Sequence, residues 1–229
     1  MKLFTPLLTL RKHIELEVYC ASPALDKMNF FDLSSRFKKP HMKAEKDIRS
    51  IGTCYGLIEM QRHSVGLQSW MDWQMEVTKD NVEFMSAQPQ FLHTDISHTD
   101  MTNDWASKNN LIVAKIEVPF VVYSKDDIDF VMASSPFLRH NLHMPSGMVN
   151  FYHTRFLNFF IYLHRDYQRV WEFNMGDSLI NLAPMSDRPI KVHNMYDKDK
   201  FDYYEQDTLH LTKSNGFYRR RSRLERNKK

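Results

Sequence analysis

The chain has 229 residues, of which 42% are hydrophobic, and it carries a formal net charge of +3 at pH 7. This length allows one large domain or two small ones, and the hydrophobic fraction is sufficient for a core. Only 6 residues are glycine and they do not cluster, which argues against the phosphate-binding loops of Rossmann and P-loop proteins.

The N-terminal residues loosely resemble a signal peptide, but Thr5 and Pro6 interrupt the apolar run and no small-residue cleavage pattern follows. No later run approaches the ~20 apolar residues of a membrane span. Cys20 and Cys54 lie among apolar residues without zinc or disulfide spacing, so we expect both to be reduced and buried. These patterns predict a soluble protein of a reducing compartment, without a membrane partner.

Residues 12–19 alternate between apolar and polar side chains. Successive side chains of a strand point to opposite faces, so this alternation predicts a half-exposed strand. Apolar residues then recur every three or four positions, which predicts a helix near residues 48–62. Gly52 and Gly56 lower the helix propensity of this segment.

The clearest alternation lies in residues 65–78. Its apolar parity consists of Val65, Leu67, Met71, Trp73, Met75 and Val77. The other parity is mostly polar, and Ser69 and Trp70 are the two exceptions. The pattern predicts one strand with a dry face and a wet face. The turn-forming residues 79–81 and the strand-like residues 82–85 predict a hairpin after it.

Residues 89–110 are polar and predict the longest loop, and Leu111 begins a long strand in which Pro119 requires an edge position or a bulge. Further short strands are expected at 148–153, 156–163, 170–174, 178–183 and 189–195. Such regular spacing is typical of a sandwich or barrel. A C-terminal helix is expected near residues 198–211.

Together these elements predict an α+β, mainly β fold. We expect a β-sandwich or a flattened barrel, similar to a jelly roll or a double-stranded β-helix, with one or two packing helices. Residues 1–213 are expected to form a single β-rich domain, and residues 214–229 a basic C-terminal tail.

Histidine and carboxylate side chains provide one candidate metal site. His93 and Asp95 have the His-x-Asp spacing that resembles the metal pair of Fe(II)/2-oxoglutarate oxygenases. A distal histidine, His140, His143 or His153, would complete the set. The same tripeptide recurs at His98, five residues later, so turn formation by these side chains is the stronger interpretation.

Two further candidates lie in the strand predicted at 65–78. Trp70 departs from the alternation and could stack on a ligand, although a covering helix or second sheet is the interpretation that we favour. Asp72 and Glu76 could form a carboxylate pair, but a solvated strand face explains them better.

The end of the chain has the strongest charge signal. Its cations are Arg219, Arg220, Arg221, Arg223, Arg226, Lys228 and Lys229. With Glu225 they give this segment a charge of +6, which leaves −3 for residues 1–218. Arginine side chains favour phosphate and carboxylate, so the five arginines predict contact with nucleic acid or an acidic partner. Non-specific contact or solubility explains the tail equally well.

Three stretches together resemble uncharacterised proteins of tailed marine phages, cyanophages included, and a related bacterial family of unknown function. They are Ser50–Ser64 with Leu67–Trp73, Ala114–Phe120, and Met175–Met185. Ser178 and Phe120 depart from the family pattern, which has Pro and Trp there. The resemblance supplies no activity or catalytic residues. It implies a phage-like origin, and hence a virion part or a protein made during infection.

We therefore expect a phage-encoded structural or accessory protein that acts through protein–protein contacts, with other virion proteins or with itself. It would work in the virion or the host cytoplasm. We favour a role without catalysis and leave an enzyme open. One alternative is an Fe(II)/2-oxoglutarate-type oxygenase that uses His93, Asp95 and His153. The other is a nucleic-acid contact through the basic tail.

Overall fold

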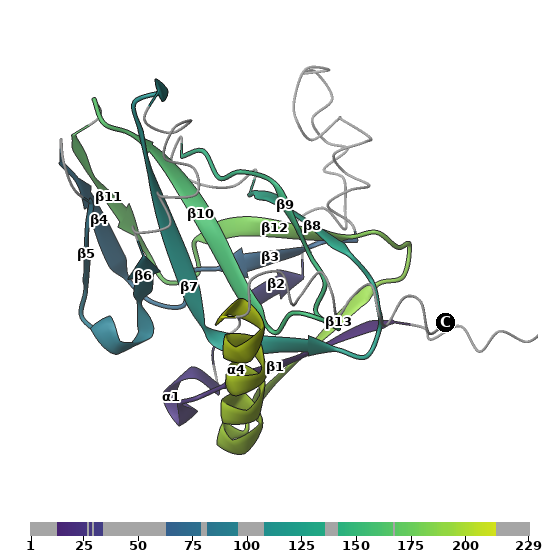
Figure 1. Cartoon of the computed structure of the whole chain (residues 1–229). Coiled ribbons are helices and arrows are strands. Elements are labelled where there is room, and N and C mark those ends of the chain that lie inside the picture. Colours follow the sequence, from purple (N-terminus) through teal and green to yellow (C-terminus); the bar gives the residue numbers. More distant parts are fainter. Residues whose placement is uncertain are drawn as a thin grey trace, which may run out of the picture.

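The computed structural model of the chain describes residues 13–26, 28, 30–33, 63–78, 82–95, 108–135, 142–166 and 168–213. Strands dominate these residues and form three sheets that pack together, as Figure 1 shows. Within the described ranges the sheets do not close into a barrel. The predicted α+β, mainly β fold is therefore confirmed, in its sandwich form.

The longest strands form a five-stranded sheet, in the order β10-β7-β1-β13, with β6 also paired to β7. These strands are β1 (Ile14–Cys20), β6 (His93–Asp95), β7 (Leu111–Ser124), β10 (Phe156–His164) and β13 (Ile190–Tyr196). β1 is antiparallel to β7 and parallel to β13. Early and late segments of the chain therefore meet inside one sheet.

Two further sheets complete the framework. The second five-stranded sheet has the order β2-β3-β12-β8-β9. Its strands are β2 (Phe31–Leu33), β3 (Val65–Gln68), β8 (Phe130–Ser134), β9 (Gly147–Val149) and β12 (Ser178–Pro184). The three-stranded sheet consists of β11 (Arg169–Phe173), β4 (Trp73–Val77) and β5 (Val82–Ser86), in that order. The predicted hairpin is confirmed, because β4 and β5 pair antiparallel.

The prediction of one strand over residues 65–78 is wrong. The chain forms β3, turns, and then forms β4 in a different sheet. The turn residues bond to another loop instead of a strand, since Ser69 donates its backbone N–H to Asp177 and accepts one from Gly176, both at 2.8 Å. Nevertheless the apolar parity stays buried on both sides of the break, as does Ser69.

Pro119 lies where the hydrogen-bond ladder of β7 changes. On one side of β7, β6 pairs with residues 115–117 and β1 pairs with residues 120–124. On the other side, the register with β10 shifts between its pairs at Glu117 and Val121. The predicted bulge is therefore confirmed, and the missing N–H of proline falls in this irregular part of the ladder.

The predicted C-terminal helix is confirmed as α4 (Lys198–Lys213), and a short α1 spans Pro23–Asp26. The helix predicted near 48–62 and Cys54 lie outside the described residues. The loop predicted over 89–110 is regular in part, because it contains a 3-10 turn at Pro89–Phe91 and strand β6.

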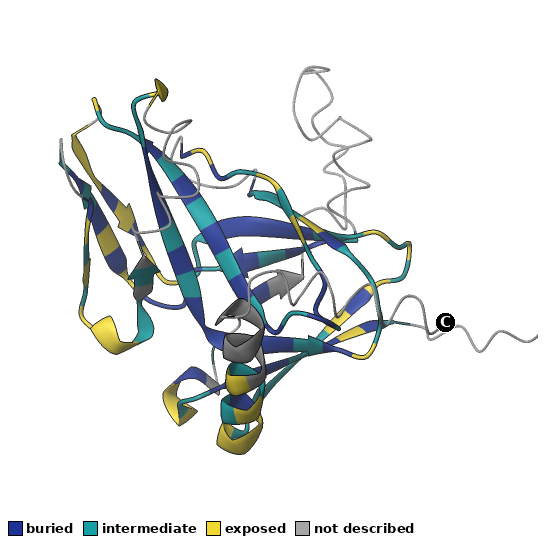
Figure 2. Cartoon of the chain, viewed as in Figure 1, coloured by how far each residue is buried: buried dark blue, intermediate teal, exposed yellow. Residues whose placement is uncertain are grey.

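A continuous core joins side chains from all three sheets. It includes Leu16 of β1, Leu67 of β3 and Trp73 of β4, each at most 2% exposed. The alternating burial of β10 is visible in Figure 2. Cys20 is buried, as predicted, and its thiol donates to the carbonyl of Met195 at 3.5 Å. Tyr19 points to the same face of β1 as Glu15 and Glu17, yet it is buried with Val121 and Phe201 under α4.

Candidate functional site

The His-x-Asp pair lies on a strand and not in the predicted loop. In the pairing of β6 with β7, His93 is opposite Glu117 and Asp95 is opposite Lys115. Residues two apart on a strand face the same side of the sheet, as a metal pair requires. The side chains of His93 and Asp95 themselves lie outside the described residues.

His153 lies near the other end of β7. It belongs to a turn whose flanking residues bond to that strand. The backbone carbonyl of Phe151 accepts the N–H of Ser124, and the backbone carbonyl of Arg155 accepts the N–H of Val122. Val122 is five residues from the partner of His93, or about 17 Å at the usual rise of a strand. The structure therefore does not bring His153 to the predicted pair.

The buried His153 side chain has a different neighbour. Its Nε2 lies 3.1 Å from Oδ1 of Asp127, and the amide of Asn150 donates to both Asp127 and Asp129 at 2.9 Å. These contacts fix the turn on the loop before β8. The described residues contain no group of three or more His, Cys, Asp or Glu side chains placed to hold a metal. The Fe(II) site with His93 and Asp95 stays a prediction.

Trp70 is covered, as we favoured. It is 1% exposed, and its ring meets that of Phe120 edge-on at 6.5 Å between centroids. Its indole N–H donates to the carbonyl of Phe91 at 2.9 Å.

Asp72 and Glu76 lie in different surroundings, because Asp72 precedes the strand and its carboxylate accepts the backbone N–H of Met175 at 2.7 Å. Neither feature forms the site that its pattern suggested.

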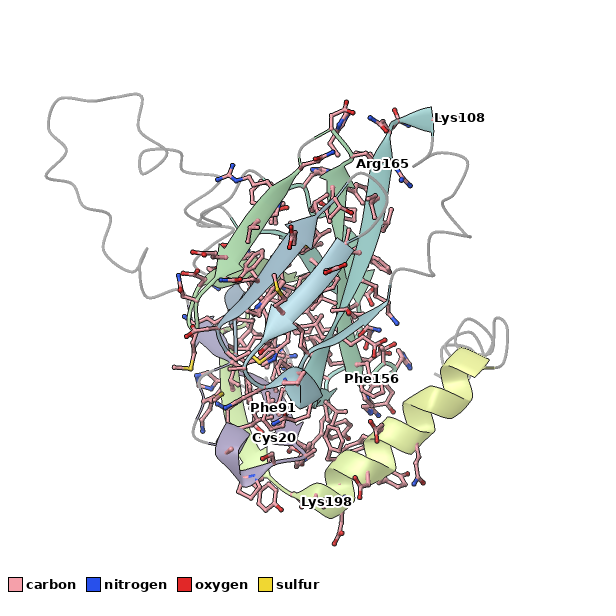
Figure 3. The ribbon with its side chains drawn as sticks, turned by 90° about the vertical axis from the view of Figure 1, so that its left-hand side faces the viewer. Cys20, Phe91, Lys108, Phe156, Arg165 and Lys198 are labelled. Carbon is pink, nitrogen blue, oxygen red and sulfur yellow. The ribbon has the colours of Figure 1, made fainter. Side chains whose placement is uncertain are left out.

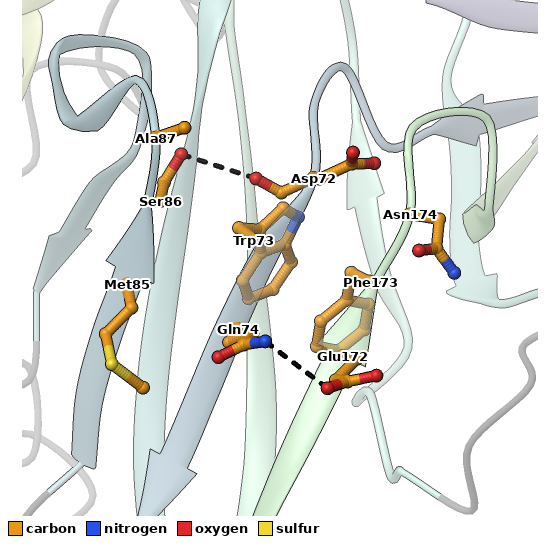
Figure 4. A pocket seen from close by; sticks show the side chains of 9 residues that line it. All are labelled: Asp72, Trp73, Gln74, Met85, Ser86, Ala87, Glu172, Phe173 and Asn174. Atoms are coloured by element: carbon orange, nitrogen blue, oxygen red, sulfur yellow. Dashed lines mark hydrogen bonds between the residues drawn. The ribbon is translucent and has the colours of Figure 1, made fainter.

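A cleft of about 400 Å³ opens on the outer side of the three-stranded sheet, and Figure 4 shows the side chains around it. Its floor contains Gln74, which donates to the Glu172 carboxylate at 3.3 Å. Asp72 and Asn174 close one end, and Met85 borders it from β5. Below the floor, the rings of Trp73 and Phe173 stack at 3.9 Å between centroids.

A second cleft, of about 360 Å³, lies between the edge strands β9 and β10, and we call it the apolar cleft. Its lining residues are Met132, Pro145, Ser146, Gly147, Met148, Val149, Thr154, Phe156, Leu157, Asn158 and Phe160. None of them is charged. Oδ1 of Asn158 is buried, and none of the described residues donates a hydrogen bond to it. Beside the cleft, Met148 is 65% exposed and pairs across the strands with the exposed Val131.

The third distinctive cluster holds α4 on the large sheet. The buried Arg155 guanidinium lies 4.6 Å from the ring centroid of Tyr123 and 5.3 Å from that of Tyr204 on α4. On the same sheet, Tyr19 donates its hydroxyl to Glu17 at 2.5 Å. Burial, and then this hydrogen bond, raise the pKa of Tyr19 above its usual range. Burial likewise raises the pKa of Tyr204.

The tail residues Arg219, Arg220, Arg221, Arg223 and Arg226 lie outside the described residues, so their predicted contacts stay predictions. Among the described residues, no helix combines the length and the apolar composition needed to cross a bilayer.

Comparison with known proteins assigns this chain to no family: no family model matches it, and no curated protein matches it either. Over the described residues, the fold itself defines the class, a mainly β protein of three packed sheets.

Sequence reasoning missed the apolar cleft. Its signal is weak but present, because β10 carries Phe156, Asn158 and Phe160 on the parity opposite to its core residues. Aromatic side chains on both parities of a strand indicate that the second face is also covered or used. The pattern does not reveal that β9 stands opposite.

Proposed function

We propose that the protein is a phage-encoded structural or accessory protein that acts through protein–protein contacts. The observation that carries this proposal is the apolar cleft, together with the exposed Met148 that lines it and the exposed Val131 opposite Met148 on β8. Exposed apolar surface next to a cleft marks interaction sites, and methionine and aromatic side chains are enriched in protein interfaces.

The chemistry of the cleft favours a protein side chain as its occupant. Phe156 and Phe160 supply apolar walls, and the described residues that line the cleft include no charged group to orient a phosphate or a carboxylate. The buried amide oxygen of Asn158 would accept one hydrogen bond, as from the indole N–H of a tryptophan or the hydroxyl of a tyrosine. An aromatic anchor that fills a pocket is the usual centre of a protein interface.

The phage origin rests on the three stretches that resemble proteins of tailed marine phages. The partner would then be another virion protein or a second copy of this chain, in the virion or in the host cytoplasm. Mass spectrometry of purified virions tests the structural version, since a virion protein is present there in fixed stoichiometry. Its consistent absence from virions would leave only an accessory role during infection.

Site-specific photo-crosslinking tests the interface. A photoreactive phenylalanine analogue replaces Met148 in the full-length protein, and the same analogue replaces Met175 as the matched control. Met175 is 62% exposed but lies after β11, away from the apolar cleft. We expect a discrete adduct from position 148 with a virion protein or with the chain itself, and none from position 175. Equal, diffuse labelling from both positions would refute the interface.

A further inference from the structure

The outer face of the three-stranded sheet carries charges of one sign. Its six side chains form two rows across the strands, Val170–Glu76–Glu83 and Glu172–Gln74–Met85. All six are exposed or half-exposed, three are glutamates and none is a cation. We call them the acidic face. Surfaces of soluble proteins usually mix both signs, so a face of this composition is unusual.

The acidic face contains a repulsive contact. Glu76 and Glu83 are directly opposite each other on β4 and β5, and like charges in this position destabilise a sheet. Within the described residues neither glutamate forms an ion pair. A cation that binds between them would remove the repulsion.

The acidic face also contains exposed apolar side chains that a ligand could contact. Met85 and Val170 are 42% and 44% exposed and lie at opposite edges of the sheet. Figure 4 shows Met85 beside the cleft that Asp72 and Asn174 close at one end. A ligand that suits this face therefore combines several positive charges with at least one apolar or aromatic group.

The chain itself contains such a ligand. In residues 214–229, Phe217 and Tyr218 precede the segment of charge +6, whereas the rest of the chain has a charge of −3. We propose that the acidic face binds this C-terminal segment of the same molecule. Arginine forks would bind the glutamates, and an aromatic ring would pack beside the Met85 thioether.

The length of the tail permits this contact. Arg219 and Lys229 lie 6 and 16 residues beyond the end of α4 at Lys213, which gives reaches of about 20 and 55 Å for an extended chain. A domain of this size is about 40 Å across. Figure 3 looks toward the three-stranded sheet and shows α4, which begins at Lys198 at the bottom of the view and extends to the lower right. A short tether also gives the tail a high effective concentration at its own surface.

Carbodiimide coupling of the full-length protein tests the proposal, because it joins lysine amines to carboxylates in direct contact. At low salt, peptide mass spectrometry should find Lys228 or Lys229 joined to Glu76, Glu83 or Glu172. Glu15, an exposed glutamate of the large sheet, is the internal control and should not couple. About 1 M salt shortens the screening length to ~3 Å and should reduce the coupling at least about fivefold.

Variants that replace glutamates of the acidic face by glutamine provide a second test. Replacing Glu76 and Glu83 together by Gln should reduce coupling of the tail to Glu172 at least about fivefold, since two of the three charges that hold the tail are gone. Glu15→Gln is the matched control and should change nothing. In a mixture of isotope-labelled and unlabelled protein, each coupled pair of peptides should be either fully labelled or fully unlabelled, because the tail binds its own molecule.

Coupling to Glu15 as often as to Glu172, an unchanged yield in salt, or products of mixed isotope would each overturn the proposal. The acidic face is separate from the apolar cleft, so these outcomes do not bear on the proposed function.

Discussion

Trp73 donates its indole N–H to the hydroxyl of Ser69 at 2.9 Å, and this bond closes the turn where the chain passes from one sheet to another. The Ser69 hydroxyl in turn donates to the carbonyl of Met71 at 2.8 Å. Both side chains are at most 2% exposed. A polar residue therefore stands at position 69, among the buried apolar residues, because its hydroxyl accepts the hydrogen bond of the buried Trp73 indole.

Replacing Ser69 by Ala should destabilise the fold. The indole N–H of Trp73 would lose its acceptor in a buried position, which costs between about 1 and 3 kcal/mol of unfolding free energy. Urea unfolding measures the loss. Ser86→Ala is the control, because the Ser86 hydroxyl is only partly buried and water can replace its bonds. An equal effect of the two changes would contradict this role of Ser69.

Arg155 should be important for the docking of α4. Its guanidinium lies over Tyr123 and Tyr204 and donates to the carbonyl of Phe151. Arg155→Ala removes these buried contacts together, so we expect a loss of about 3 kcal/mol of unfolding free energy. Hydrogen exchange should show weaker protection of α4 in the variant.

The matched control for this change is Arg169→Ala. Arg169 lies 4.5 Å from the ring centroid of Trp171, a geometry similar to that of Arg155 over Tyr123, but its side chain is exposed. An exposed cation–π contact contributes only about 0.5–1 kcal/mol. If both variants lost the same stability, burial would not be the reason why Arg155 matters.

The raised pKa of Tyr19 predicts a loss of stability at alkaline pH. Above pH ~10, tyrosine ionises in the unfolded chain while the folded protein keeps the proton. The folded state then binds more protons than the unfolded state, so stability is complete below pH ~10 and falls as the pH rises, by up to about 1.4 kcal/mol per pH unit.

Unfolding in urea at a series of alkaline pH values measures this slope. Tyr19→Phe should make it shallower, and Tyr204→Phe should do the same to a smaller degree. Tyr203→Phe is the control on α4, since that ring is 67% exposed, and it should keep the wild-type slope. A Tyr19→Phe variant with an unchanged slope would show that the buried phenol does not govern the alkaline loss.

The stack of Trp73 on Phe173 should hold the three-stranded sheet together. The two rings are cross-strand partners, nearly parallel at 8°, and both are buried. Phe173→Leu keeps the apolar volume but loses the ring pairing, at a cost of about 1 kcal/mol. Phe173→Ala adds a cavity and should cost about 3–5 kcal/mol. Thermal unfolding ranks the two variants. A Phe173→Leu variant as stable as the wild type would mean that ring stacking contributes nothing beyond apolar volume.

The candidate sites were only partly predictable, because each draws on residues far apart in the chain. Met148 of β9 and Asn158 of β10 meet at the apolar cleft, yet nothing in either local sequence shows that these strands face each other. Glu76 and Glu83 are both visible as polar residues of a predicted hairpin, but their repulsion becomes evident only from the register. The sequence around His93 predicts a loop, because three residues are too few to show the alternation of a strand.

The sequence by itself determined which side chains are hidden. Alternation is a local property, so Val65, Leu67, Trp73, Met75 and Val77 were correctly assigned to the core even though the single strand that would carry them does not exist. Only the tertiary structure decided how the strands are shared among sheets. That choice depends on hydrogen bonds between distant segments, such as the parallel pairing of β1 with β13, and every strand offers the same backbone groups to any neighbour.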